Sequence, residues 1–265
     1  MKPGVSILIP TCNRPNFFMR ALQSAFKQTY KNIEIIICDD SENNKTEEIV
    51  KKLPASYQTF VKYYKNPHNL GAARNYQKCL ALASGQYINY LNDDDLFHPQ
   101  KIETMMYYFM HYEHISLVTS LRLPIDKYGR NITVNRKSIK KLFEKNTIIS
   151  GQELAKIVLT ERINYIGEPT TVLFKRDKLD EPFAVYSGKE ALCNHDVASW
   201  LNLLEKGRAV YLTKPLSFFR IHESQIQNMP GAREDGKKDW EEHLCLWQKR
   251  HGELHASSPL AARGR

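Results

Sequence analysis

The first 121 residues alternate between short apolar runs and segments in which apolar residues recur at helical spacing. The apolar runs lie at 5–10, 33–38, 60–64, 86–91 and 115–121, and the helical patterns at 16–28, 46–53, 71–83 and 99–112. Continuous apolar runs of this length are typical of strands that are buried on both faces. Strands that alternate with helices predict an α/β fold with a Rossmann-like, mostly parallel central sheet and helices on both of its faces.

The regular pattern weakens after residue 122. Residues 127–146 are polar and loop-like, and Ser150 with Glu153 predicts a capping box for a helix at 150–159. A strand at 170–174, a helix at 196–206, strands at 209–212 and 216–221 and a helix at 237–250 follow. We divide the chain into a 1–122 half, a 123–236 half of the same domain, and a 237–265 segment that holds the last helix and a tail, disordered from residue 256.

Charge and cysteine content exclude several classes of protein. The formal net charge is +9, but the basic residues are dispersed and match no nucleic-acid-binding signature, so we expect no nucleic acid partner. This charge permits peripheral contact with an anionic inner membrane. The five cysteines are scattered without a CxxC pair, which argues against disulfides or a zinc site and favours the cytoplasm. No apolar stretch reaches the roughly 18–20 residues of a membrane span.

Polar residues collect directly after three of the predicted strands. Pro10 and Thr11 open the set after the first strand, Asp39 and Asp40 follow the second, and 92–95 follows the fourth. Ligands of open parallel sheets bind beyond the carboxyl ends of the strands, so these sets should converge on one crevice.

The triplet Asp93, Asp94 and Asp95 has two interpretations. Adjacent carboxylates repel each other until a cation neutralises them, and Mg²⁺ or Mn²⁺ prefers such oxygens, with phosphates completing the shell. Alternatively, the triplet forms a turn and caps the helix that Pro99 opens. Its place among the other polar sets favours the cation site.

Because no glycine-rich phosphate loop occurs, basic side chains such as Arg74 would help to hold phosphates; the alternative for Arg74 is an ordinary surface charge.

Four segments resemble the family 2 glycosyltransferases, which have the GT-A fold. They are VSILIPTCNR at 5–14, IIICDDS at 35–41 with Thr46 beyond it, NLGAARN at 69–75, and YINYLNDDDLFHP at 87–99. All four lie within residues 4–112, and the match is looser beyond them. The resemblance implies that the 1–122 half binds a nucleotide-sugar donor, with UDP as the first expectation for the nucleotide.

The resemblance also implies roles for individual residues of this half. Pro10, Thr11, Asp39 and Asp40 would contact the nucleoside, and Arg74 the base or the phosphates. Asp93 would face ribose or metal, Asp94 would be the principal ligand of a divalent metal, Mn²⁺ or Mg²⁺, and Asp95 would lie at the edge of the metal or cap the helix. Asn92 departs from the family's Asp-x-Asp-Asp motif, which leaves the number of coordinating carboxylates open.

For the 123–236 half, the resemblance implies acceptor contacts and a catalytic base. Asp196 matches the acidic pair that the family often places at the start of a helix, with His195 in place of the usual glutamate; the alternative is that Asp196 is only an N-cap. Arg220 and His222 resemble the family's Arg-x-His segment, so His222 would bind metal or pyrophosphate. A purely structural histidine is the alternative.

The expected activity is inverting, metal-assisted sugar transfer to an acceptor hydroxyl in surface glycan or glycoconjugate biosynthesis, with Asp196 as general base. A glycan, a lipid-linked intermediate or a protein could be the acceptor, and the chain could be one domain of a larger synthase or part of an oligomer. The alternatives are a sugar nucleotidyltransferase and a non-catalytic GT-A-like binding domain. Nucleotidyltransferases usually carry a glycine-rich basic loop after the first strand, and residues 11–15 do not match one.

Overall fold

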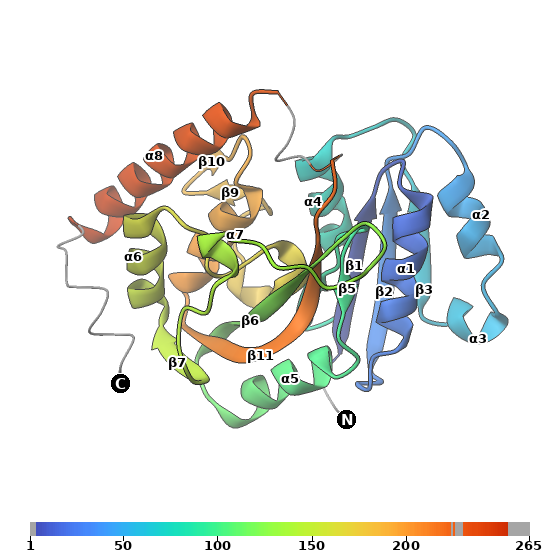
Figure 1. Ribbon diagram of the computed structural model, residues 1–265, viewed down its shortest axis with the longest axis horizontal. Helices are drawn as coiled ribbons and strands as arrows, with labels where there is room; N and C mark the ends of the chain where they lie inside the picture. Colours follow the sequence, from blue (N-terminus) through green and yellow to red (C-terminus); the bar gives the residue numbers. More distant parts are fainter. Residues whose placement is uncertain (1–3, 224, 226–229, 254–265) are drawn as a thin grey trace.

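The structure is a computed structural model that describes residues 4–223, 225 and 230–253. Figure 1 follows its elements along the chain from blue to red. The strands are β1 Val5–Thr11, β2 Ile33–Asp39, β3 Val61–Lys65, β4 Tyr87–Tyr90, β5 Leu96–Phe97, β6 Ile115–Ile125, β7 Thr147–Ser150, β8 Leu173–Lys175, β9 Val185–Tyr186, β10 Lys189–Glu190 and β11 Arg208–Arg220. The α-helices are α1 Pro15–Phe26, α2 Lys45–Lys51, α3 Ala55–Gln58, α4 Ala72–Leu82, α5 Lys101–His111, α6 Gly151–Glu161, α7 His195–Leu204 and α8 Ala232–His251. Short 3₁₀ helices are η1 Lys137–Ile139, η2 Pro169–Thr171 and η3 Arg176–Lys178.

Among the described residues, nine strands form one sheet in the order β3-β2-β1-β4-β8-β6-β11-β5, with β7 paired to β11. Strands β1 to β4 run parallel to their neighbours within this group, and β6 runs parallel to β11. Strands β5, β7 and β8 are antiparallel to their neighbours. The predicted α/β fold with a mostly parallel central sheet is confirmed. Strand β8 belongs to the second half of the chain, yet it lies between β4 and β6 of the first half.

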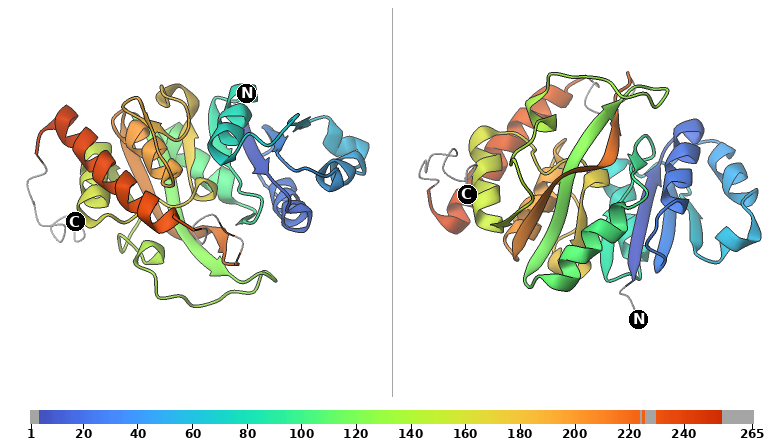
Figure 2. Two further views of the ribbon diagram at one scale, coloured as in Figure 1. Left: turned by 90° about the horizontal axis from the view of Figure 1, so that it is seen from above. Right: turned by 60° about the horizontal axis from the view of Figure 1, so that its bottom comes forward.

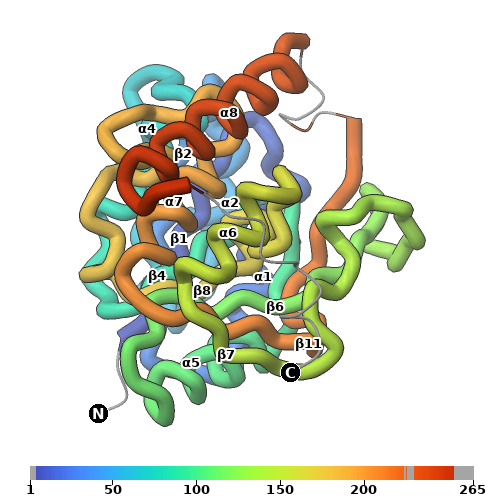
Figure 3. Tube along the Cα trace, turned by 90° about the vertical axis from the view of Figure 1, so that its left-hand side faces the viewer, coloured from blue at the N-terminus to red at the C-terminus, as the bar shows by residue number. Residues whose placement is uncertain are grey.

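Helices cover both faces of the sheet, as predicted. Helices α1 and α5 pack on one face, where Ile7 and Ile9 of β1 point. Helices α4, α6, α7 and α8 contribute to the core on the other face, where Leu8 points. Because successive side chains of a strand point to opposite faces, both faces of β1 must be apolar, which explains the unbroken apolar run. Figure 3 shows α8 at the outside of this second face, next to α6.

Strand β11 differs from the prediction of two separate strands at 209–212 and 216–221. It runs without a break from Arg208 to Arg220 beside β6, as Figure 2 shows, and its register shifts between Leu212 and Ser217. Pro215 lies within the irregular stretch and cannot donate a ladder hydrogen bond, so the shift accommodates it inside one strand. Pro215 therefore lies in a bulge within one strand and does not separate two strands.

Several other local predictions were wrong. Ser150 precedes α6 but makes no side-chain capping hydrogen bond, so the capping box does not form. Residues 169–171 form η2, and the strand expected at 170–174 begins only at Leu173. Helix α5 begins at Lys101 with Gln100 as its N-cap, so the aspartate triplet does not cap it. The short elements α3, β5, β7, β9 and β10 were missed because they are too brief to show a periodicity.

Helix α8 begins at Ala232, five residues before the expected start. The prediction began too late because the first turn of the helix is polar and shows no apolar periodicity. Its Trp247 is fully buried in the core. The tail expected to be disordered from residue 256 lies outside the described residues. In the part of the chain that the structure describes, no helix combines the length and apolar character that crossing a bilayer requires.

Candidate functional site

The carboxyl ends of β1, β2 and β4 lie side by side and bring the predicted polar sets together. The hydroxyl group of Thr11, the last residue of β1, donates a hydrogen bond to Asp93 Oδ2 over 2.9 Å. The backbone N–H of Cys12 donates to the same oxygen over 3.3 Å. Pro10 lies opposite Cys38 in the register of β1 and β2. The first and third polar sets are therefore in direct contact.

Asp39 and Asp40 are both buried at the end of β2. Tyr63 Oη donates to Asp39 Oδ2 over 2.7 Å, and Lys65 Nζ lies 3.3 Å from the same oxygen. Asp40 Oδ2 accepts the backbone N–H of Leu70 over 3.1 Å. Asp39 is thus neutralised by a neighbouring strand, whereas Asp40 fixes the turn that leads into α4.

Arg74 lies in the first turn of α4 and is exposed. Its Nη2 is 3.1 Å from Glu190 Oε2 of β10, and its Nη1 donates to Gln77 Oε1 over 3.1 Å. Among the described residues, it makes no hydrogen bond or ion pair with the aspartate triplet. The structure therefore places Arg74 between α4 and the β9–β10 hairpin, and its nucleotide role stays a prediction.

Asp93 and Asp94 share one cation, Arg14. Arg14 Nη1 lies 3.2 Å from Asp93 Oδ1 and 3.0 Å from Asp94 Oδ2. Asp94 Oδ2 also lies 3.0 Å from Nε2 of His222, just beyond the end of β11. We had quoted Arg14 as part of the first motif but assigned it no role. Its position directly after the β1 turn was the signal that could have identified it.

Asp95 turns away from this group. Its Oδ1 accepts the backbone N–H of Arg220 over 2.9 Å. Its Oδ2 accepts hydrogen bonds from Thr170 Oγ1 over 2.6 Å and from Asn92 Nδ2 over 3.3 Å. Asp95 therefore joins β11 and η2 to the triplet, and its assignment as a metal ligand stays a prediction.

The acidic triplet is short of positive charge despite Arg14. Burial and the charge of Asp94 raise the pKa of Asp93 to about 6, although Arg14 and the Thr11 hydroxyl oppose the shift. The same two causes raise the pKa of Asp95 well above its ordinary value. Carboxylates with raised pKa values at the carboxyl edge of a sheet are typical of a functional site that gains a cation.

Asp94 offers a carboxylate oxygen, which Mn²⁺ and Mg²⁺ prefer, and Nε2 of His222 lies beside it as a second, softer donor atom. Within residues 4–223, 225 and 230–253, no set of three or more histidine, cysteine, aspartate or glutamate side chains forms a complete metal site. A cation held by Asp94 and His222 would need further oxygen ligands, which phosphates provide. The residues thus fit a site that a nucleotide diphosphate completes.

The end of β11 is fixed against α1. The ring of His222 lies 4.9 Å from the ring of Phe17, and the Arg220 guanidinium lies 5.0 Å from the centre of the same ring. Arg220 Nε also donates to the backbone oxygen of Asp94 over 2.6 Å. These contacts position His222 opposite Asp94.

Asp196 is the second residue of α7. Its Oδ2 accepts a hydrogen bond from Asn164 Nδ2 over 2.8 Å, and its Oδ1 accepts the backbone N–H of Val197 over 2.9 Å. The N-cap of α7 is Asn194, whose side chain makes no capping hydrogen bond, and Asp196 is the second helical residue, so the interpretation of Asp196 as the N-cap is wrong. Asp196 is partly exposed.

Burial, followed by the charge of Glu168, raises the pKa of Asp196 to about 7. The backbone N–H of Val197 and the Arg122 guanidinium oppose the shift. A carboxylate whose pKa lies near neutrality is partly ionised at pH 7 and has an appreciable affinity for a proton. These are the properties of a general base.

A buried network supports Asp196 from β6. Arg122 Nε lies 2.6 Å from Glu168 Oε2, and Arg122 Nη2 donates to the backbone oxygen of Asn164 over 3.3 Å. Asn164 in turn donates to Asp196. The sequence gives no signal for these residues, because the loop at 162–168 has no periodicity and matches none of the four family-like segments, and Arg122 lies just beyond the strand expected at 115–121.

Tyr76 of α4 lies beside the residue that precedes the triplet. Its Oη donates to Asn92 Oδ1 over 2.6 Å. Burial raises its pKa well above the ordinary value, and among the carboxylates that add to this shift are Asp94 and Asp196. The 164–170 segment also links the triplet with Asp196, since Asn164 donates to Asp196 and Thr170 of the same segment donates to Asp95.

Comparison with known proteins supports the same family as the quoted segments. A sequence model described as Glycosyl transferase family 2 matches residues 6–181. The chain is 30% identical over 226 residues to the Escherichia coli protein named UDP-Glc:alpha-D-GlcNAc-diphosphoundecaprenol beta-1,3-glucosyltransferase WfaP, which covers 84% of the chain and 79% of the relative. Other relatives are matched over differing shares of their length, for example 70% of a Rickettsia typhi glycosyltransferase and 14% of one from Rickettsia bellii.

Solved structures show the same fold. S. aureus TarS 1–349 in complex with UDP-GlcNAc aligns with a TM-score of 0.66 at 14% identity, covering 99% of the chain and 76% of TarS 1–349. The mannosyltransferase PcManGT from Pyrobaculum calidifontis, in complex with GDP-Man and Mn²⁺, aligns with a TM-score of 0.60 at 14% identity, covering 96% of the chain and 66% of that protein. The predicted GT-A fold is confirmed.

Proposed function

The chain belongs to glycosyltransferase family 2 and is a glycosyltransferase, and we propose that it transfers a sugar from a UDP-sugar to an acceptor hydroxyl with inversion at the anomeric carbon. The Escherichia coli relative is named for UDP-Glc, and TarS 1–349 was solved in complex with UDP-GlcNAc, which supports UDP as the nucleotide. The proposed acceptor is a surface glycan or glycoconjugate.

The observation that carries the proposal is the position and protonation of Asp196. This carboxylate is linked to the triplet through the 164–170 segment, receives a hydrogen bond from Asn164 at 2.8 Å, and has a pKa raised to about 7. A base of this strength suits the removal of a proton from a hydroxyl group at neutral pH.

On the donor side, Pro10, Thr11, Asp39 and Asp40 line the carboxyl ends of β1 and β2, where we propose that the nucleoside binds. Asp93 stands next to them through its hydrogen bond with Thr11. Asp94 and His222 would hold a divalent cation, which stabilises the charge that develops on the departing diphosphate. The Mn²⁺ in the PcManGT complex supports this cofactor.

In the proposed step, the acceptor oxygen forms a bond to the anomeric carbon while the bond between that carbon and the diphosphate oxygen breaks. Asp196 takes the proton of the acceptor hydroxyl as the new bond forms. Asn164 holds the Asp196 carboxylate in place. Because the acceptor attacks the anomeric carbon directly, the enzyme needs no nucleophile of its own.

The test is a calorimetric titration of the protein with UDP, dTDP and GDP, each with and without Mn²⁺, followed by UDP release from UDP-glucose and UDP-GlcNAc. We expect Mn²⁺-dependent binding of UDP, and its loss in Asp94→Ala. Asp177→Ala is the matched control because Asp177 is an exposed carboxylate on η3 whose partner is Lys175, outside the site. If no nucleotide bound under any metal condition, the proposal would be wrong.

A further inference from the structure

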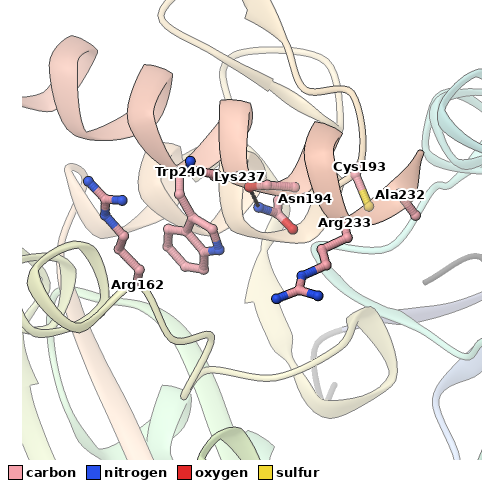
Figure 4. Close-up of a pocket in the computed structure, with 8 residues that line it drawn as sticks. Arg162, Cys193, Asn194, Ala232, Arg233, Lys237 and Trp240 are labelled. Atoms are coloured by element: carbon pink, nitrogen blue, oxygen red, sulfur yellow. Dashed lines mark hydrogen bonds between the residues drawn. The ribbon is translucent and has the colours of Figure 1, made fainter. Parts of the chain in front are cut away.

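A pocket of about 450 Å³ opens where the first turns of α8 meet the segment that precedes α7 and the residue that follows α6. Its lining consists of Arg162, Cys193, Asn194, Ala232, Arg233, Gly236, Lys237 and Trp240. Figure 4 shows Arg233 and Trp240 projecting from the same side of α8, with Arg162 beyond the Trp240 ring. The volume lies in the range of pockets that bind small molecules.

The pocket lining is strongly basic. Arg162, Arg233 and Lys237 are exposed, and none of them forms an ion pair with any residue that the structure describes. No carboxylate is among the described residues that line the pocket. In the first turns of α8, Asp235 pairs with Lys238 and Asp239 is buried, which leaves Glu234 as the one exposed carboxylate beside Arg233. The three cations of the lining outnumber this carboxylate and attract an anion.

The pocket walls are held rigidly together by Asp239. Its Oδ1 accepts the backbone N–H of Leu192 over 2.9 Å, and its Oδ2 accepts those of Cys193 and Asn194 over 2.7 Å each. Asn194 Nδ2 donates to the backbone oxygen of Gly236 over 2.9 Å, as the dashed line in Figure 4 shows. Helix α8 is thus clamped to the segment that carries Asp196.

Two walls of the pocket, the segment before α7 and the residue after α6, lead along the chain toward Asp196. Asn194 precedes Asp196 by two residues, and Arg162 precedes Asn164, the hydrogen-bond partner of Asp196, by two residues. Two residues of chain span at most roughly 7 Å. An acceptor whose hydroxyl reaches Asp196 therefore has the cationic pocket within the length of one or two sugar units.

We infer that this pocket binds the phosphate or diphosphate group of a glycosyl phosphate acceptor. The inference rests on the proposed function, because it takes Asp196 as the group that receives the acceptor proton. Guanidinium groups such as those of Arg162 and Arg233 match phosphate oxygens in pairs. The Trp240 ring presents an apolar plane on which a sugar ring packs.

The test uses a hexose 1-diphosphate octyl ester as probe, with an octyl hexoside and an octyl hexuronide, which lack phosphate, as comparisons. Binding is followed by the indole NMR signals of the tryptophans. Trp200 and Trp247 are fully buried, so the third signal, assigned with Trp240→Phe, reports on the pocket. We expect the diphosphate probe to shift the Trp240 signal and the octyl hexoside to leave it unchanged.

Arg162→Gln and Arg233→Gln should each weaken binding of the probe by roughly tenfold, since each loses one charge-assisted contact. Lys156→Gln, an exposed cation on α6 outside the pocket, is the matched control. UDP added with Mn²⁺ should not displace the probe, which separates an acceptor phosphate from the diphosphate of the donor.

Three results would overturn the inference: probe affinity that is unchanged in both arginine variants, equal binding of the octyl hexuronide, or displacement of the probe by UDP. UDP binding is measured on the same samples. If the wild type binds UDP with Mn²⁺ but the pocket variants do not affect the probe, the pocket inference alone fails. If the wild type does not bind UDP, the proposed function fails.

Discussion

Arg14 Nη1 lies 3.0 Å from Asp94 Oδ2, so a guanidinium group forms an ion pair with the carboxylate that we propose as the metal ligand. The same nitrogen lies 3.2 Å from Asp93 Oδ1. Arg14 is therefore a built-in counterion, and a divalent cation at Asp94 has to compete with it.

This competition predicts the effect of Arg14→Gln. Removal of the guanidinium should tighten binding of Mn²⁺ in the absence of nucleotide by roughly tenfold, equivalent to about 1.4 kcal/mol. Calorimetry or the paramagnetic signal of free Mn²⁺ measures the affinity. Lys27→Gln, an exposed change of the same charge after α1, should have no effect. Unchanged or weaker Mn²⁺ binding in Arg14→Gln would show that Arg14 does not compete for this site.

Asp196→Asn should lower kcat by roughly a hundred- to ten-thousand-fold, the usual contribution of a general base, and leave UDP binding unchanged. In the wild type, the rate should rise with pH through about 7 and then level off, because the base acts only when it is ionised and its pKa is raised to about 7. Initial rates of UDP release between pH 5 and pH 9 measure both effects. A wild-type rate that is independent of pH across this range would count against Asp196 as the base.

Glu168→Gln should move the acidic limb of that profile to lower pH. Burial is the larger cause of the raised pKa of Asp196, and the charge of Glu168 is the next. Without this charge, the pKa of Asp196 falls, because the nearby Arg122 guanidinium then stabilises the ionised carboxylate without opposition from Glu168. We expect a shift of roughly half a pH unit to one unit. Glu153→Gln, on the exposed side of α6, is the control, and a shift to higher pH would contradict the electrostatic explanation.

Glu34 of β2 should make stability depend on pH. Burial alone would raise its pKa, but hydrogen bonds from Lys62, Ser6 and Ser84 lower it to about 2. Since the ordinary value is 4.5, the ionised carboxylate stabilises the fold above pH 5, by about 1–2 kcal/mol once solvent screening at the half-exposed Lys62 is allowed for, and this stabilisation is lost as the pH falls toward 2.

Urea unfolding at pH 7 and pH 3 tests this prediction with Glu34→Gln. The variant should be less stable than the wild type at pH 7, and the difference should shrink at pH 3. Glu42→Gln, an exposed change, should match the wild type at both values. An equal difference at pH 7 and pH 3 would mean that the ionised form of Glu34 has no special role.

The fold could be predicted where burial makes apolar residues recur at a regular spacing along the chain. The continuous apolar runs of β1 and β2 and the helical spacing of α1 and α4 follow from strands buried on both faces. The convergence of Thr11, Asp40 and Asp93 followed from parallel topology, because the ends of parallel strands meet at one edge. None of these inferences required knowledge of a side-chain contact.

The rest of the site depends on contacts between distant segments, which carry no local signal. Arg122 lies in β6, one residue beyond the strand expected at 115–121, and carries no signal of a site, yet its guanidinium donates to the backbone oxygen of Asn164. Asp239 lies in a polar helix and is buried only because α8 packs on the segment before α7. Such residues become visible only when the tertiary structure brings their partners to them.

The insertion of β8 between β4 and β6 limits how recombination can give this chain a new specificity. A chimera joined near residue 122 would take β4 and most of β6 from one parent, and it would take β8, which lies between them in the sheet, from the other. The long β11 adds a second seam, since it pairs with β5, β6 and β7 and ends against Asp95. New specificities are therefore more readily acquired by changing exposed side chains, such as those of Lys189 and Leu192, than by exchanging whole halves.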